Sequence, residues 1–168
     1  MSFSLLRSVA TILDRDLGTL RREVEAYPDE RGLWLEVPGI SNVAGTLALH
    51  LAGNLQHYIG AHLGQTGYVR DRAAEFARRD VPRSQLLSEI EAARAGVKAA
   101  LSREPEPDVT AEYPETIAGS KVTTGDYLIH LATHFAYHLG QIDYHRRVVT
   151  GAAFAVDAMR PSELSSAR

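Results

Sequence analysis

Apolar residues recur every three or four positions along several long stretches of the chain, which is the pattern of amphipathic α-helices. In the first stretch these residues are Leu5, Leu6, Val9, Leu13, Leu17, Leu20 and Val24. The same period predicts four long helices near residues 1–27, 41–63, 83–103 and 123–150. A shorter apolar stretch in the tail predicts one extra helix around Phe154–Met159.

Capping and helix-breaking residues mark the expected ends of these helices. The expected N-caps are Ser41 or Asn42, Ser84, and Thr123 or Thr124, and Gly151 is the expected C-cap. The stretch "YVRDRAAEFARRDVP" is predicted to be a charged connection. The stretch "PEPDVTAEYPETIAGSKVTTG" contains too many prolines and glycines for a helix, so we expect a loop or a short strand pair.

Four long helices with long connections after the first three predict an all-α fold, a four-helix bundle with a short extra C-terminal helix. A length of 168 residues fits a single domain over 1–168. The formal net charge of −3 shows no basic excess, which argues against nucleic-acid binding.

Two further features of the composition exclude classes of protein. The chain has no cysteine, which rules out a disulfide framework, a thiolate nucleophile and thiolate metal ligands. The N-terminal apolar stretch is short and is interrupted by Arg7, so it resembles neither a signal peptide nor a membrane span. We therefore expect a cytoplasmic protein without a membrane association.

Four of the seven histidines lie in "HLATHFAYHLGQIDYHRR", at 130, 134, 138 and 145. At about 100° per residue, all four share one narrow helix face with Gln141, beside the apolar stripe of that helix. The predicted second helix is similar, because His50, Asn54 and His57 fall within about 60° of one another. His62 falls elsewhere on that helix and is expected to be exposed.

Three interpretations of the histidines remain open at this point: a metal site, a haem site, or a hydrogen-bonded polar seam along the bundle. Histidines four apart on a helix face the same way, so two helices of this kind could surround one metal ion. The chain lacks the HExxH motif of zinc proteases and any Glu-x-x-His motif of carboxylate-bridged iron proteins. It also lacks a CxxCH motif for covalent haem.

Several short motifs together resemble the DinB/YfiT-like superfamily of metal-binding four-helix bundles. "HLATHFAYHLGQI" resembles its fourth-helix signature, in which HxxxH is followed by one residue and then Gly-Gln. "HLAGNL" followed by Arg70, Arg72, Glu75 and Phe76 resembles a branch defined only as a domain of unknown function.

The resemblance implies one divalent metal ion, nickel or zinc, held by three histidines. His50 matches the ligand of the second helix, and His134 and His138 match the HxxxH motif. It also implies a homodimer, and some relatives are transferases that use a low-molecular-weight thiol such as mycothiol, bacillithiol or glutathione. His57 and His130 lie outside the ligand pattern of the family.

Around this site, Gln141 is expected to orient a ligand histidine, and Arg70 and Arg72 are candidates for holding an anionic group of a thiol cosubstrate. The alternative for the two arginines is a salt-bridged loop. The predicted function is a metal-dependent transferase or hydrolase acting on small molecules, which would activate a bound thiol or water. The alternative is a non-catalytic, dimeric metal-binding bundle with a structural or stress-related role.

Overall fold

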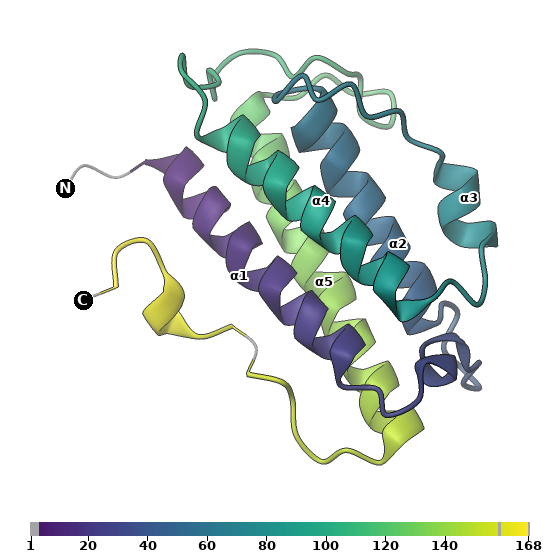
Figure 1. Cartoon of the computed structure of the whole chain (residues 1–168). Helices are drawn as coiled ribbons and strands as arrows, with labels where there is room; N and C mark the ends of the chain where they lie inside the picture. The colour runs from purple at the N-terminus through teal and green to yellow at the C-terminus, as the bar shows by residue number, and fades with distance from the viewer. Residues whose placement is uncertain (1–3, 158, 168) are drawn as a thin grey trace.

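The computed structural model describes residues 4–157 and 159–167 and contains four long helices. These are α1 (Leu5–Glu25), α2 (Ala44–Leu55), α4 (Arg83–Leu101) and α5 (Thr124–Thr150). A π-helical turn, η2 (Gln56–Ala61), continues α2, and α3 (Arg72–Ala77) is a short helix outside the bundle (Figure 1). Two short 3₁₀ turns complete the fold: η1 (Glu30–Trp34) and η3 (Pro161–Glu163).

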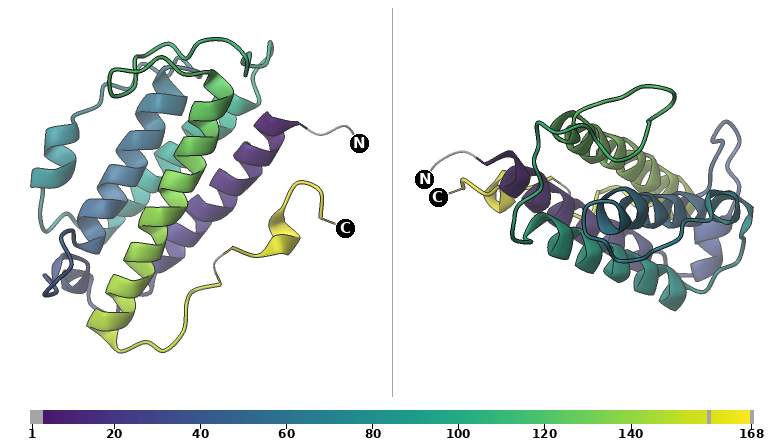
Figure 2. Two further views of the ribbon diagram at one scale, coloured as in Figure 1. Left: turned by 180° about the vertical axis from the view of Figure 1, so that it is seen from behind. Right: turned by 90° about the horizontal axis from the view of Figure 1, so that it is seen from above.

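The helices form a four-helix bundle, as the sequence predicts. α1 packs against α4 and α5, and α2 packs against the same two helices from the other side. α1 and α5 run in one direction and α2 and α4 in the other, so the segment 62–82 carries the chain back along the bundle (Figures 1 and 2). α3 lies on this return segment and packs against α2.

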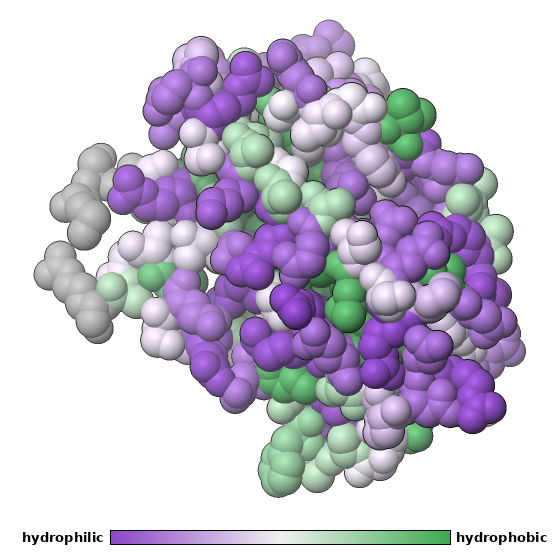
Figure 3. Space-filling model, in the orientation of Figure 1, coloured by the Kyte–Doolittle hydropathy of each residue, from purple (hydrophilic) through white to green (hydrophobic). Residues whose placement is uncertain are grey.

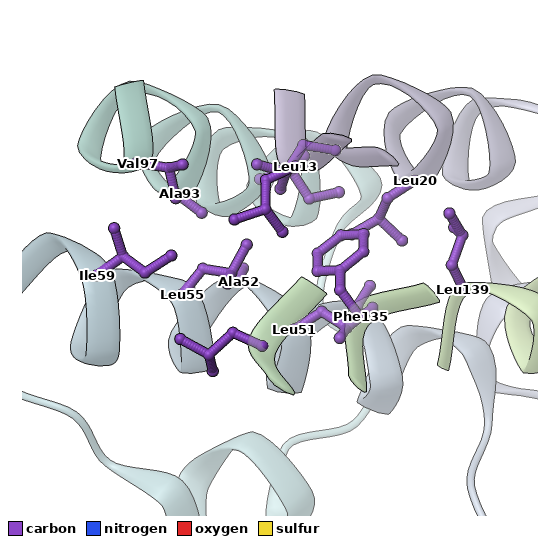
Figure 4. Packing of buried hydrophobic residues seen from close by; sticks show 14 of the residues in the cluster. Leu13, Leu20, Leu51, Ala52, Leu55, Ile59, Ala93, Val97, Phe135 and Leu139 are labelled. Carbon is purple, nitrogen blue, oxygen red and sulfur yellow. The ribbon is translucent and has the colours of Figure 1, made fainter. Parts of the chain in front are cut away.

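The core lies between the four helices and includes Leu13 and Leu20 of α1, Leu51 of α2, Val97 of α4 and Phe135 of α5 (Figure 4). Every residue of α2 is buried, including its polar ones. This follows from its neighbours, because α4, α5, α3 and η1 all contact it. A polar side chain of α2 therefore has to find its partner inside the protein.

The predicted caps are correct only for α5. Thr123 accepts a hydrogen bond from the backbone N–H of Asp126, and Gly151 ends the helix with a φ of 72°. Ser41 and Asn42 are not caps, because α2 begins at Ala44 after an extended Val43. Ser84 is wrong as well, since Pro82 precedes α4 and its fixed φ already suits a helix start.

Two short segments also differ from the predictions. Residues 72–77, expected to be a charged connection, form α3, whose N-cap Asp71 accepts from the N–H of Ala74 at 2.9 Å. The predicted helix around Phe154–Met159 is absent from its described residues, and the tail has a 3₁₀ turn at Pro161–Glu163 instead. Arg146 and Arg22 donate to the carbonyls of Phe154 and Val156, which takes up acceptors that a helix would need.

The connection 102–123 contains two isolated β-bridges, Glu112 with Thr123 and Ile117 with Ser120, and no strand among the described residues. Over the same described ranges, no helix combines the length and the apolar composition that crossing a bilayer requires. Hydrophilic side chains cover most of the face seen in Figure 3, as expected for the outer sides of amphipathic helices.

Candidate metal centre

His50 of α2 meets His134 and His138 of α5 inside the bundle. One nitrogen atom from each of the three rings lies within 4.8 Å of the others. The Nε2 atoms of His50 and His134 are 3.4 Å apart, and the rings of His134 and His138 have centroids 4.6 Å apart. The structure thus brings together the three histidines that the sequence indicates as ligands.

Glu75 holds His50 from the side away from the other two histidines. Nδ1 of His50 lies 3.0 Å from Oε2 of Glu75. A carboxylate accepts hydrogen bonds, so Nδ1 carries a proton and Nε2 faces the centre of the cluster. Metal-bound histidines commonly have such a carboxylate on their second nitrogen.

Gly53 makes this contact between α2 and α3 possible. A Cβ atom at position 53 would lie 2.9 Å from Cδ of Glu75, closer than real Cβ atoms approach. Gly53 comes three residues after His50 and therefore lies on the same side of α2. The motif "HLAGNL" has a glycine at this position because a larger residue would collide with the carboxylate of Glu75.

Arg70 fixes Glu75 in turn. Its Nε and Nη2 donate to the two carboxylate oxygens at 2.7 and 2.8 Å, and both side chains are buried. Burial opposes the ionised carboxylate, but the hydrogen bonds from Arg70 and His50 outweigh it and lower the pKa of Glu75. Glu75 is therefore an anion that can hold the Nδ1 proton of His50.

Gln141 plays the corresponding part for His138. Nδ1 of His138 lies 2.7 Å from Oε1 of Gln141, one turn further along α5. The amide oxygen accepts, so Nδ1 donates and Nε2 keeps its lone pair. Burial is the main cause of the lowered pKa of His138, and the hydrogen bond that its Nδ1–H donates to Gln141 opposes it.

His134 differs from the other two histidines because its Nδ1 is buried without a hydrogen-bond partner among the described residues. Burial, and then the neighbouring His138, His50 and His130, lower the pKa of His134 to about 4. The ring is therefore neutral at physiological pH, as a metal ligand must be.

The other members of the histidine row on α5 lie outside this cluster. His130 is exposed and stacks on Tyr127 and His134. His145 is completely buried elsewhere, where its Nε2–H donates to the carbonyl of Leu35 at 2.9 Å and its Nδ1 accepts from the hydroxyl of Tyr27 at 2.8 Å. The prediction of one common histidine face over 130–145 is therefore correct at the centre of the row. It is misleading for His145, because α1 and η1 cover that end of α5.

The prediction for His62 is wrong in a different way. His62 is half-buried and hydrogen-bonded to Glu115, and His57 binds the same carboxylate oxygen. The π-helical turn at 56–61 changes the angle between these two histidines, and nothing in the sequence signals it.

The two candidate arginines have different surroundings. Arg70 is committed to Glu75, as in the salt-bridged alternative, and its Cζ also lies 5.5 Å from the ring centroid of Tyr58. Arg72 is exposed, and its Cζ lies 5.0 Å from the ring centroid of Phe76, whose own ring packs beside His50. Arg72 is therefore at the outer edge of the cluster.

A cavity of about 210 Å³ has Gln141 in its wall, but none of the three histidines lines it. Its other walls are Gly39, Ile40, Ser41, Asn42 and Tyr144. Three imidazoles that meet at one point fit a divalent metal ion, because three histidine ligands leave further coordination positions for a small ligand. Imidazole donors from two helices that leave coordination positions open make metal-assisted chemistry on a small molecule feasible here.

Comparison with known proteins agrees with this geometry. The family model described as mycothiol-S-transferase matches residues 8–151, which includes all three histidines and the residues that orient them. No curated protein matches, and no solved structure matches. The match covers most of the chain and agrees with the superfamily that the sequence motifs suggest. The chain belongs to the mycothiol-S-transferase family, within the DinB/YfiT-like superfamily.

Proposed function

We propose that this protein transfers a low-molecular-weight thiol, such as mycothiol, to a small electrophile at a divalent metal ion bound by His50, His134 and His138. One observation carries the proposal. The lone pairs of His50 and His138 are directed to a common point by partners on their opposite nitrogens, Glu75 and Gln141. The family match supports the thiol as the substrate class.

Nickel and zinc are the metals we propose, since both accept imidazole nitrogen as a ligand. The bound ion would supply a Lewis acid that lowers the pKa of a coordinated thiol. The thiol itself has to come from a cosubstrate, because the chain contains no cysteine. A hydrolase with water in place of the thiol is the related reaction that the same residues would support.

The protein's own residues would keep the site in one state of protonation and in one orientation. Glu75 keeps the Nδ1 proton of His50, and Arg70 keeps Glu75 ionised and in place. The lowered pKa of His134 keeps its ring neutral above about pH 4. These contacts hold the ligand rings in place before any metal arrives.

We propose different contributions for the two arginines. Arg72 is exposed at the edge of the cluster and would contact an anionic part of the thiol cosubstrate. Arg70, whose guanidinium is occupied by Glu75, would add positive charge near that group rather than hold it directly.

A homodimer is part of the proposal. The outer face of α5 exposes Ile129, Tyr137, Tyr144 and Val148, at 47%, 66%, 65% and 59% of their surface. Their spacing of eight, seven and four residues places them on one side of the helix. Such a stripe is suited to contact with the same stripe of a second copy. The single domain and the cytoplasmic location stay predictions.

Thiol transfer can be tested directly with protein purified without an affinity tag and loaded with Zn²⁺ or Ni²⁺. Mycothiol, bacillithiol and glutathione would each be supplied with a fluorogenic small electrophile. We expect an accelerated reaction with at least one thiol, and a loss of about a hundredfold or more in His134→Ala. His130→Ala, which changes an exposed histidine of the same helix, should keep the activity.

If the metal binds but none of the three thiols reacts faster than in buffer, thiol transfer is wrong. The non-catalytic metal-binding bundle would then be the better description. If His134→Ala loses the metal but keeps its activity, the reaction takes place somewhere other than this site.

A further inference from the structure

A second group of possible metal ligands lies at the far end of α2. His57 and His62 come from the π-helical turn and its end, and Glu115 comes from the connection 102–123. Nε2 of His57 and Nε2 of His62 lie 2.9 and 2.8 Å from the same oxygen, Oε2 of Glu115. One ligand atom from each residue lies within 4.8 Å of the other two.

The π-helical turn is what brings the two histidines together. Residues five apart on a regular α-helix point about 140° away from each other. In the turn at 56–61 the hydrogen bonds run five residues back, as in the 3.2 Å bond from the N–H of His62 to the carbonyl of His57. The two rings consequently have centroids 4.7 Å apart. Single π-turns of this kind occur frequently at functional sites.

Neighbouring aromatic rings hold the group in position. The ring of His62 stacks on Tyr58 and packs against Tyr113, at centroid distances of 6.5 and 5.8 Å. The hydroxyl of Tyr113 donates to the carbonyl of Tyr58 at 2.5 Å, which fixes one ring relative to the other. The side chains of His57 and His62 are only 23% and 27% exposed, so they are fixed in place and still reachable by an ion from solvent.

We propose that His57, His62 and Glu115 bind a second divalent metal ion, best matched by Zn²⁺, independently of the centre formed by His50, His134 and His138. Two imidazoles and one carboxylate are a donor set that zinc uses elsewhere. Ligand atoms around a tetrahedral zinc ion lie about 3.3 Å apart. Each histidine needs to separate from Glu115 by only about half an ångström to admit the ion in place of the two hydrogen bonds.

The two sites share no ligand. His50 and His57 are seven residues apart, a rise of about 10 Å along a helix. The second site also has a different role. It ties the connection 102–123 to the end of α2, so its ion would hold this loop against the bundle.

The proposal is tested by counting bound Zn²⁺ in metal-stripped, untagged protein after equilibrium dialysis. We expect about two ions per chain in the unmodified protein and about one in His62→Ala, in Glu115→Gln and in His134→Ala. Combining Glu115→Gln with His134→Ala should remove both. The matched controls are Glu106→Gln, an exposed carboxylate of the same connection, and His130→Ala, and both should bind two.

A second measurement concerns the loop itself. Zn²⁺ should slow tryptic cleavage after Lys121 in the unmodified protein and in Glu106→Gln, but not in Glu115→Gln. Glu115→Gln keeps the size of the side chain, so it decides the question even if His62→Ala fails to fold. A single bound ion in the unmodified protein, or two in Glu115→Gln, would overturn the second site. The centre at His50 would be unaffected by that result.

Discussion

At the scale of single residues, the candidate centre depends on a chain of contacts that starts outside the ligands. Arg70 holds Glu75, Glu75 holds the Nδ1 proton of His50, and Gly53 leaves the space in which this happens. A residue that does not touch the metal ion can therefore change the affinity of the site for that ion.

Gly53→Ala should weaken metal binding by about tenfold to a hundredfold, the range seen when the outer partners of a ligand are lost. The added methyl group would push Glu75 away from His50. Gly140→Ala is the matched control, because a Cβ atom there meets nothing within 4 Å. Competition with a chromogenic chelator measures the affinity. Equal affinities in the two variants would contradict the role given to Glu75.

Gln141 can be tested by separating its hydrogen bond from its size. Gln141→Leu removes the acceptor for Nδ1 of His138 and should lower metal affinity by about tenfold or more. Gln141→Glu keeps an acceptor oxygen at the same place and should restore most of the affinity. The same chelator competition applies, and a Leu variant that binds like the unmodified protein would show that the contact does not matter.

His145 gives a pH dependence that is separate from the metal. Burial lowers its pKa, and the hydrogen bond to Leu35 offsets this only in part. Below about pH 6.5, His145 binds a proton in the unfolded chain but not in the folded one. The free energy of unfolding should therefore fall as the pH is lowered from about 7 to about 5. Denaturant unfolding of metal-free protein should show a shallower fall in His145→Gln. Identical slopes would count against this source of pH dependence.

At the scale of elements, α1 and α5 are joined by a buried ion pair. Arg146 donates to Glu23 at 2.5 Å and also binds Asp143, and the side chains of Arg146 and Glu23 are 3% and 0% exposed. Burial raises the pKa of Glu23 even though Arg146 opposes this. The pair therefore depends on both partners being present.

Arg146→Ala should lower the free energy of unfolding by about 3–5 kcal/mol, because it leaves the carboxylate of Glu23 buried and unpaired. Replacing both residues, as Glu23→Leu with Arg146→Met, should recover most of this loss. Denaturant unfolding of the three proteins makes the comparison. If the double variant is no more stable than Arg146→Ala, the loss comes from packing rather than from the unpaired charge.

The elements also show how far the sequence predicts this protein. The period of apolar residues locates the four long helices, since one side of α1, α4 and α5 faces the core along its whole length. It does not reveal α3, whose few residues are too short for a periodic pattern. Nor does it reveal the π-helical turn. The buried residues Leu55 and Ile59 are four positions apart, a spacing that fits a regular α-helix as well as a π-helix, so the changed hydrogen bonds leave no mark on the apolar pattern.

For the site, the resemblance to the superfamily implies His50, His134 and His138 as ligands, and the structure brings these three residues together. The partnership of Glu75 with His50 joins residues 25 positions apart on different helices, so no local pattern contains it. The same holds for Glu115, whose partners lie 53 and 58 residues earlier.

At the scale of the whole molecule, the proposed dimer makes a clear prediction. Tyr137→Glu combined with Tyr144→Glu places two charges on the exposed stripe of α5 and should produce a monomer of 18.4 kDa. Light scattering measures the mass, and circular dichroism verifies that the helices are retained. Light scattering that gives a monomer already for the unmodified protein would refute the dimer.

The return of the chain along segment 62–82 has a consequence for how new reactivity would evolve in this fold. The ligands lie on α2 and α5, whose residues also form the core, so substitutions there cost stability. Arg70, Arg72, Glu75 and Phe76 reach the ligands from outside the four long helices, on the return segment and α3. Exchanging this segment between family members should therefore transfer differences in substrate preference while leaving the rest of the protein unchanged.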